Sequence, residues 1–136
     1  MSSREEFRFT GLARPGVAEA AITLSHAVVK RGTNPFDVAV TAAASDVPVG
    51  RVNKRQATAG ASIEDGVQPF HHGQVLKLVS DGSITAAGDL IKSTGSGKVG
   101  KATPTTADII FGRSVEAQTT DGNYVLCEVW PPYKHY

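Results

Sequence analysis

The sequence contains a single cysteine, so no internal disulfide can support the fold. That residue, Cys127, stands in an apolar segment, where we interpret it as a small, unreactive side chain of a strand. No run of about 18 apolar residues occurs, which excludes a transmembrane helix, and we expect no membrane partner. The N-terminal residues lack the apolar core of a signal peptide, so secretion is not expected.

An excess of charge of one sign is also lacking. The 136 residues include 14 Lys and Arg and 13 Asp and Glu, which gives a formal net charge of +1. The basic residues are scattered along the chain rather than gathered in a stripe, so we expect no nucleic-acid partner. With 40% hydrophobic and 20% charged residues, the chain can build a core. Its length favours one domain or two closely packed half-domains.

No motif for catalysis or for metal or cofactor binding is complete. Segment 95–98 reads Gly-Ser-Gly-Lys, but a phosphate loop would also need glycine in place of Lys92 and serine or threonine in place of Val99, so we interpret the segment as a hairpin tip. His71 and His72 are adjacent, and adjacent strand residues point to opposite faces, which disfavours a shared metal. We expect no enzymatic activity, no cofactor and no metal site. A hydrolase with an unrecognised site is the weakest alternative.

What the sequence does contain is one segment that occurs twice, 62 residues apart. Gly50-Arg51 in the first copy returns as Gly112-Arg113 in the second. The same gap-free displacement joins further pairs: Val28 and Leu90, Lys30 and Lys92, Thr41 and Thr103, Asp46 and Asp108, Gln56 and Gln118, Thr58 and Thr120, Gly60 and Gly122, Ile63 and Val125, Val67 and Val129. Self-similarity at a fixed period indicates a repeated structural unit. We therefore expect residues 27–67 and 89–129 to follow the same backbone path.

Each copy is made of short apolar, β-branched runs separated by turn residues, which is typical of strands with tight connections. The repeated Gly50 and Gly112 indicate a bulge or a close backbone approach. Gly60 and Gly122 stand where a turn would need a positive φ. The sequence therefore predicts a small, all-β, internally duplicated domain of the β-sandwich or β-tulip kind over residues 17–132.

The repeated charged residues have structural interpretations. Asp46 and Asp108 can accept hydrogen bonds from backbone N–H groups at the start of a strand. Arg51 and Arg113 are expected to lay their stems over the sheet and to keep their charged heads in water. None of these four residues stands in a catalytic motif.

Three local patterns carry further expectations. Residues 17–30 fit both helical and strand spacing, and the duplication favours strand. Asp81-Gly82 stands between two alternating apolar stretches and predicts a hairpin there. Pro131-Pro132 is expected to end the last strand, because proline cannot donate to a β-ladder.

The two ends of the chain carry aromatic residues. Residues 1–16 are expected to form an extended arm in which Phe7 and Phe9 share one face and Arg8 lies on the other. Such an arm needs a surface to lie against, whether its own domain, a sister subunit or a foreign protein. Trp130, Tyr133 and Tyr136 mark the other end, the last two in a tail of residues 133–136. Aromatic clusters of this kind form interfaces or stacking platforms for sugars and nucleotides.

A family resemblance rests on several short segments: the Asp-x-x-x-Gly-Arg turns, Gly-Gln-Val-Leu-Lys-Leu at 73–78, Ala-Gly-Asp at 87–89, Gly-Arg-Ser-Val-Glu-Ala at 112–117 and the last strand at 124–130. With these, residues 21–130 resemble the small decoration (cement) proteins of tailed-bacteriophage heads. The resemblance implies a β-sandwich or β-tulip domain that binds the outer surface of a capsid, often as a trimer. It would bridge neighbouring major capsid protein subunits and stabilise the DNA-filled head.

The sequence thus predicts a structural virion protein, made in the host cytoplasm and located on the outer capsid surface. Its expected partners are the major capsid protein and itself, as a homotrimer. The terminal aromatic residues and Arg8 are the expected interface. The rival interpretation is a carbohydrate- or receptor-binding module of a phage spike or fibre, which would use the same aromatic residues.

Overall fold

The computed structural model describes the backbone of residues 14–103 and 108–134, and their side chains as far as residue 131. All regular structure in these ranges is β-sheet, which confirms the all-β class, and none of it forms a helix that could cross a membrane. The ten strands are β1 (Val17–Ala18), β2 (Val28–Arg31), β3 (Asp37–Val40), β4 (Gly50–Val52), β5 (Val67–Pro69), β6 (Gln74–Val79), β7 (Leu90–Gly95), β8 (Lys98–Lys101), β9 (Ile109–Ser114) and β10 (Tyr124–Lys134).

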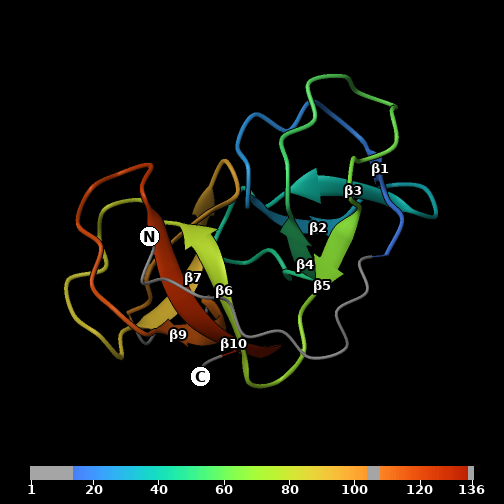
Figure 1. Cartoon of the computed structure of the whole chain (residues 1–136). Helices are drawn as coiled ribbons and strands as arrows, with labels where there is room; N and C mark the ends of the chain where they lie inside the picture. Colours follow the sequence, from blue (N-terminus) through green and yellow to red (C-terminus); the bar gives the residue numbers. More distant parts are fainter. Residues whose placement is uncertain (1–13, 104–107, 135–136) are drawn as a thin grey trace.

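The strands form two five-stranded sheets, ordered β1-β3-β2-β4-β5 and β6-β10-β9-β7-β8. Figure 1 shows the first sheet at one end of the molecule and the second at the other. We call the parts of the chain that carry β1–β5 and β6–β10 the first and second halves. The first sheet contains only the first five strands of the chain and the second sheet only the last five. Each half is therefore a β-unit built from its own stretch of sequence.

The two halves repeat the same pairing register. Val28 pairs with Arg51 between β2 and β4, and Leu90 pairs with Arg113 between β7 and β9, a displacement of 62 residues on both strands. Outside the strands, the bridge between Ile22 and Gln56 returns between Ile84 and Gln118 at the same displacement. The duplication predicted from the sequence is therefore present in the backbone.

The displacement changes further along each copy. Gly50 pairs with Pro69, whereas Gly112 pairs with Val129, so Val67 corresponds to Cys127 and not to Val129. The displacement changes because the first half has two extra residues, Glu64 and Asp65. They lie in a turn in which the N–H of Gly66 donates to the Ile63 carbonyl. The predicted match of Val67 with Val129 is wrong for this reason.

A smaller shift affects β3 and β8. The amide of Thr41 donates to the Val28 carbonyl at 3.0 Å, and the corresponding donor to the Leu90 carbonyl is the amide of Ala102 at 2.7 Å. Thr41 therefore corresponds to Ala102, and its predicted match with Thr103 is wrong by one residue.

Each sheet curls until its two ends meet. In the first half, the bridges Arg14 to Val67 and Val17 to Ser62 connect the β1 segment to the β5 segment. In the second half, the edge strand β6 pairs with β10. Ser80, the residue directly after β6, bridges Val99 of the other edge strand, β8. Curling of this kind encloses one apolar core per half.

The two cores use corresponding positions. Ile22 and Val29 of the first core correspond to Ile84 and Ile91 of the second core. Val52 also lies in the first core. The first core contains Ala18, Ile22, Ala27, Val29, Val38, Val52, Ile63 and Val67; the second contains Val28, Leu76, Leu78, Ile84, Ile91, Val99, Phe111, Val125, Cys127 and Val129. Val28 belongs to a first-half strand but packs in the second core, so it joins the two halves.

The three local predictions from the sequence have different outcomes in the structure. Residues 17–30 contain β1 and the start of β2 and no helix, as the duplication indicated. The hairpin predicted at Asp81-Gly82 is wrong, because β6 pairs with β10 and the chain runs on to Ile84, which bridges Gln118. The prediction that Pro131-Pro132 ends the last strand is wrong, because β10 continues to Lys134; its register against β9 shifts between Val129 and Tyr133, where the prolines stand.

Candidate interaction surfaces

The repeated glycines occupy positions that a side chain would disrupt. A Cβ on Gly50 would lie 2.5 Å from the carbonyl oxygen of Gln68, and one on Gly112 would overlap the carbonyl oxygen of Glu128. Both obstacles are backbone atoms of the neighbouring strand, so a rotamer change cannot relieve the contact. Gly60 has φ +81° and Gly122 has φ +90°, which confirms the turns predicted there.

The two repeated arginines have different surroundings. Arg51 is fully buried, and its Nη1 donates to the carbonyl of Lys77 in β6 at 3.1 Å, so it connects the first half to the second. The side chain of Arg113 is 56% exposed, with its Nε 3.4 Å from Oε1 of Glu128. The predicted exposure of the charged head is therefore confirmed for Arg113 and wrong for Arg51, because Arg51 faces the other half.

A second repeated pair of charges was not recognised as a pair in the sequence. Lys30 contacts Asp46 with an N–O distance of 3.1 Å, and Lys92 contacts Asp108 at 3.4 Å, again 62 residues apart. Asp46 also accepts the N–H groups of Ala42 and Ala43 at 2.7 and 3.1 Å, so the predicted bonds to backbone N–H groups are present, but they lie after the end of β3 and not at the start of a strand. The residues that would form the same turn before Asp108 lie outside the described residues.

The surroundings of Asp46 lower its pKa. Burial alone would raise the pKa, but the amide of Ala42, the ammonium of Lys30 and the amide of Ala43 favour the carboxylate more strongly, so the pKa lies below its ordinary value. Asp46 therefore holds the β3–β4 loop in place in its ionised form.

The single cysteine and the adjacent histidines have different surroundings. Cys127 is fully buried; this burial, and then the charge of Glu116, raise the pKa of its thiol far above the ordinary value, so the thiolate is not accessible. His71 and His72 follow β5, and no set of three or more His, Cys, Asp or Glu in the described part of the chain could hold a metal. Segment 95–98 forms the β7–β8 connection, as predicted.

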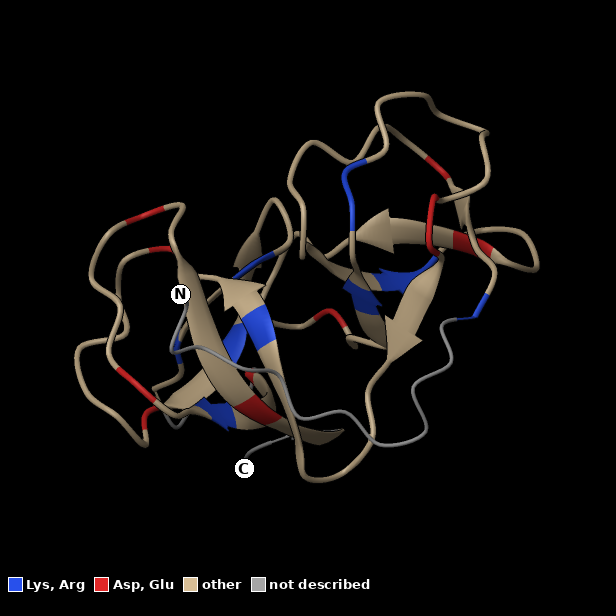
Figure 2. Cartoon of the chain, viewed as in Figure 1, with Lys and Arg blue, Asp and Glu red and all other residues tan. Residues whose placement is uncertain are grey.

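One polar hollow of about 450 Å³ is lined by Ser83, Ser93, Lys92 and Lys101, among others. Its two lysines have acidic partners, since Lys92 contacts Asp108 at 3.4 Å and Lys101 lies 3.8 Å from a carboxylate oxygen of Asp89. Figure 2 shows basic and acidic residues interspersed over both halves. In the described parts of the chain, the charges therefore form no broad field of one sign.

Most of the predicted interface residues fall outside the described parts. Phe7, Arg8, Phe9 and Tyr136 lie in residues that the structure does not describe, as does the side chain of Tyr133. Trp130 lies in β10 and is half-buried, and its indole N–H is buried without a hydrogen-bond partner among the described residues. Their role at an interface remains a prediction.

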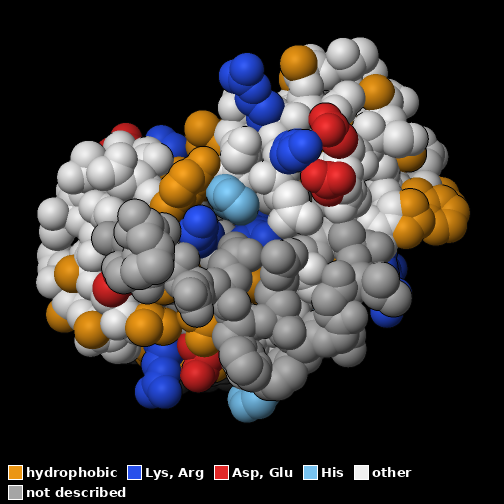
Figure 3. Space-filling model, viewed as in Figure 1, with side chains coloured by type: hydrophobic (Ala, Val, Ile, Leu, Met, Phe, Trp, Pro, Cys, Tyr) orange, Lys and Arg blue, Asp and Glu red, His pale blue; other side chains and the backbone are white. Residues whose placement is uncertain are grey.

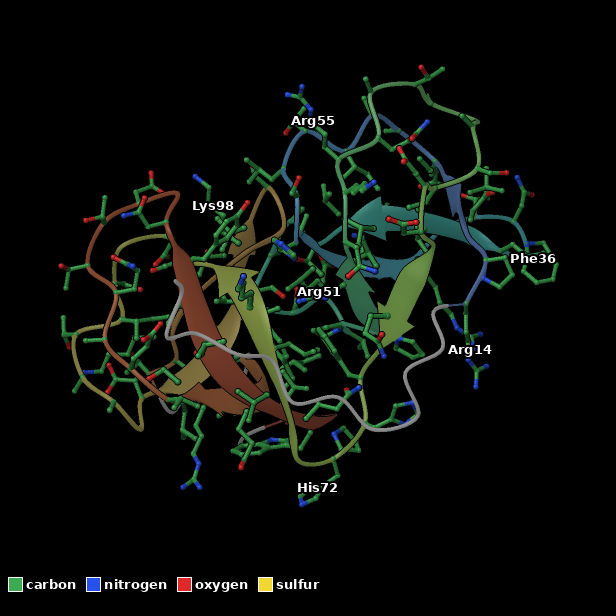
Figure 4. The ribbon with its side chains drawn as sticks, in the orientation of Figure 1. Arg14, Phe36, Arg51, Arg55, His72 and Lys98 are labelled. Atoms are coloured by element: carbon green, nitrogen blue, oxygen red, sulfur yellow. The ribbon has the colours of Figure 1, made fainter. Side chains whose placement is uncertain are left out.

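The structure reveals one candidate contact residue that the sequence reading missed. Phe36 is 71% exposed at the β2–β3 connection and has φ +68°, a conformation that few bulky residues adopt. It borders an open hollow of about 700 Å³ whose lining includes Pro35, Val49 and Pro69. Figure 4 shows Phe36 projecting from the first half, away from the second, and Figure 3 shows exposed hydrophobic atoms at that end. The signal in the sequence is an aromatic residue within the turn segment 32–36.

No model of a known protein family and no curated protein sequence matches the chain. Among solved structures, the fold is similar to the crystal structure of the N base of head fiber gp8.5 in bacteriophage phi29. The TM-score is 0.52 at 15% sequence identity, and the match covers 90% of this chain and 97% of that one. At this identity the similarity shows a shared fold, one that extends over nearly the whole of both chains.

Proposed function

We propose that this chain is a structural protein of a tailed-bacteriophage virion that binds the outside of the head. The observation that carries the proposal is the fold match to the base of a phage head fibre, which covers 97% of that chain. The resemblance of residues 21–130 to head decoration proteins, drawn from the sequence, points to the same part of the virion. Two β-units, each built around an apolar core, fit a load-bearing role better than a catalytic one.

The more specific form of the proposal is a cement. In this form a homotrimer bridges neighbouring subunits of the major capsid protein and stabilises the DNA-filled head. Binding strength comes from buried apolar surface at the arm and the aromatic end of β10, multiplied over many copies on one shell. The protein is made in the host cytoplasm and added to the outer capsid surface.

The second candidate is a receptor- or carbohydrate-binding module of a phage fibre. The match to the N base of a head fiber favours it specifically, because that protein is part of a fibre. In this case the chain attaches to the head, but its removal leaves head stability unchanged.

Heads prepared with and without this protein test both forms. Purified protein is added back to heads that lack it, and bound copies are located by cryo-electron microscopy. A cement raises the temperature at which the heads release DNA; a fibre module leaves that temperature unchanged and alters adsorption to cells or binding on a glycan array. Absence of binding to heads from any maturation stage would refute the proposal.

A further inference from the structure

A hairpin tip makes part of the contact between the two halves. The β7–β8 connection of the second half lies on the first half, where the N–H of Gly97 donates to the Thr41 carbonyl at 3.0 Å and its carbonyl accepts the N–H of Val28 at 2.9 Å. A Cβ on Gly97 would lie 2.7 Å from the Cβ of Ala27. The tip therefore fits because it carries no side chain at this point.

The surface that receives this tip is formed by the start of β2 and the end of β3. It comprises Ala27, Val28 and Thr41, and beyond it the Ala44 carbonyl accepts the N–H of Ile109 at 2.9 Å. The side chain of Val28 packs in the core of the second half. We call this surface the receiving face of the first half.

This internal contact is heterologous, because it joins a tip of one half to a different surface of the other. The tip of the first half, residues 32–36 with Phe36, projects away from the second half (Figure 4). Since the halves share one topology, the second half has its own receiving face. In it, Leu90 occupies the position of Val28, and Ala102 occupies the position of Thr41. Among the residues that the structure describes, one tip and one receiving face thus have no contact partner in the other half of the same chain.

We propose that these two surfaces bind each other between copies of the chain, with Phe36 of one copy packed over Leu90 of the next. The contact continues the one that already joins the two halves. Heterologous contacts of this kind close into a ring or extend as a filament. The proposal concerns self-association alone and does not depend on the proposed role on phage heads.

The tip is prepared for such a contact. The N–H of Gly32 donates to the Asp37 carbonyl at 2.7 Å, and the N–H of Asp37 donates to the Asn34 carbonyl at 3.0 Å. These bonds hold Phe36 at φ +68°, with 71% of the residue exposed. A bulky residue kept in an unfavourable backbone conformation and exposed to water is a sign of function.

The receiving face of the second half can accept an aromatic ring. Leu90 is half-buried and its carbonyl accepts the Ala102 amide at 2.7 Å, so the backbone has the geometry found at Val28. Asp89 replaces Ala27, but its carboxylate accepts the N–H groups of Thr85 and Ala86, each at 3.1 Å, and so is occupied within its own loop. Phe36 cannot enter as deeply as Gly97 does, and we expect its ring to cover Leu90 instead.

Cross-linking between two variants, each with one added cysteine, tests the proposal. Pro35→Cys places a thiol on the tip, and Thr103→Cys places one beside the receiving face; both positions are exposed. The native Cys127 is fully buried and stays silent to a maleimide. A short bismaleimide should couple the two variants when they are mixed, and neither variant alone. Ala59→Cys, exposed in a different turn of the first half, replaces Pro35→Cys in the control mixture.

Sedimentation velocity supplies the second measurement. Phe36→Asp should weaken self-association about tenfold or more, because it removes an aromatic contact and adds a charge. Val47→Asp, at a position 52% exposed and outside both surfaces, should leave association unchanged. The proposal is overturned if the mixture gives no cross-link, if Pro35→Cys couples to itself, or if Phe36→Asp affects only binding to heads.

Discussion

Single residues decide where the strands of each half come close together. Gly50 and Gly112 each lie against a carbonyl group of the next strand, and neither has a positive φ, so their role is to leave space. Gly60 and Gly122 play the other role, with positive φ and nothing within 4 Å of an added Cβ. Substitution by alanine separates these two roles.

Gly50→Ala and Gly112→Ala should each destabilise the protein by several kcal/mol, since strands must move apart to admit the methyl group. Gly60→Ala and Gly122→Ala are the matched controls and should cost only about 1–2 kcal/mol, the penalty for alanine at positive φ. Urea unfolding followed by circular dichroism measures all four. Equal losses in the two pairs would contradict the steric role of Gly50 and Gly112.

Asp46 should make stability depend on pH. Its pKa in the folded protein lies below the ordinary value of 3.8, so its contribution is present above that pH and is lost as the pH falls through the folded pKa. Asp46→Asn should therefore destabilise the protein at pH 7 by about 1 kcal/mol, and the difference from wild type should shrink toward pH 3. Chemical denaturation of both proteins at several pH values measures this, and a difference that stays constant with pH would argue against it.

At the scale of elements, the sequence predicted the repeat but not every register. A shift of two residues preserves the inward and outward alternation of a strand, so Val67 fits Val129 in the sequence as well as it fits its true counterpart, Cys127. The match of Thr41 with Thr103 failed differently, because Thr41 is fully buried and Thr103 is exposed; only the residue type agreed.

The environment of Arg51 could not be predicted locally. Both copies read Gly-Arg, and the difference between buried Arg51 and exposed Arg113 comes from the packing of one half against the other. The terminal aromatic residues could be predicted as an interface from the sequence because they cluster at the chain ends. The exposure of Phe36 was found only in the three-dimensional structure. Turn residues such as Asn34 and Pro35 indicate a loop but do not indicate that an aromatic side chain projects from it.

Deleting Glu64 and Asp65 should be tolerated. These residues are the extra pair relative to the second half, and their side chains, 65% and 56% exposed, form ion pairs with Lys54. We expect the shortened chain to fold with a melting temperature within a few degrees of wild type, because surface ion pairs contribute little. Deleting Leu126 and Cys127 from β10 is the control and should abolish folding, since both are buried. Loss of folding in both would disprove the assigned insertion.

At the scale of the whole molecule, two β-units share one interface through Val28, Arg51 and the Gly97 tip. Each unit has its own core, yet Val28 of the first half lies in the core of the second, so the second core is incomplete without the first half. Heating should therefore unfold both halves in one transition. A single transition is expected because local opening of one half also breaks its contacts with the other.

The arm is expected to add binding to heads rather than stability to the domain. Phe7 and Phe9 could together bury about 300 Å² of apolar surface, worth several kcal/mol before the cost of ordering the arm. Deleting residues 1–10 should leave the melting temperature unchanged within a few degrees and should lower occupancy on heads in cryo-electron micrographs. The double variant Phe7→Ala/Phe9→Ala should reproduce most of this loss, whereas Arg8→Ala, a rim contact, should have a small effect. Full occupancy of heads by the truncated protein would show that attachment depends on the β-units alone.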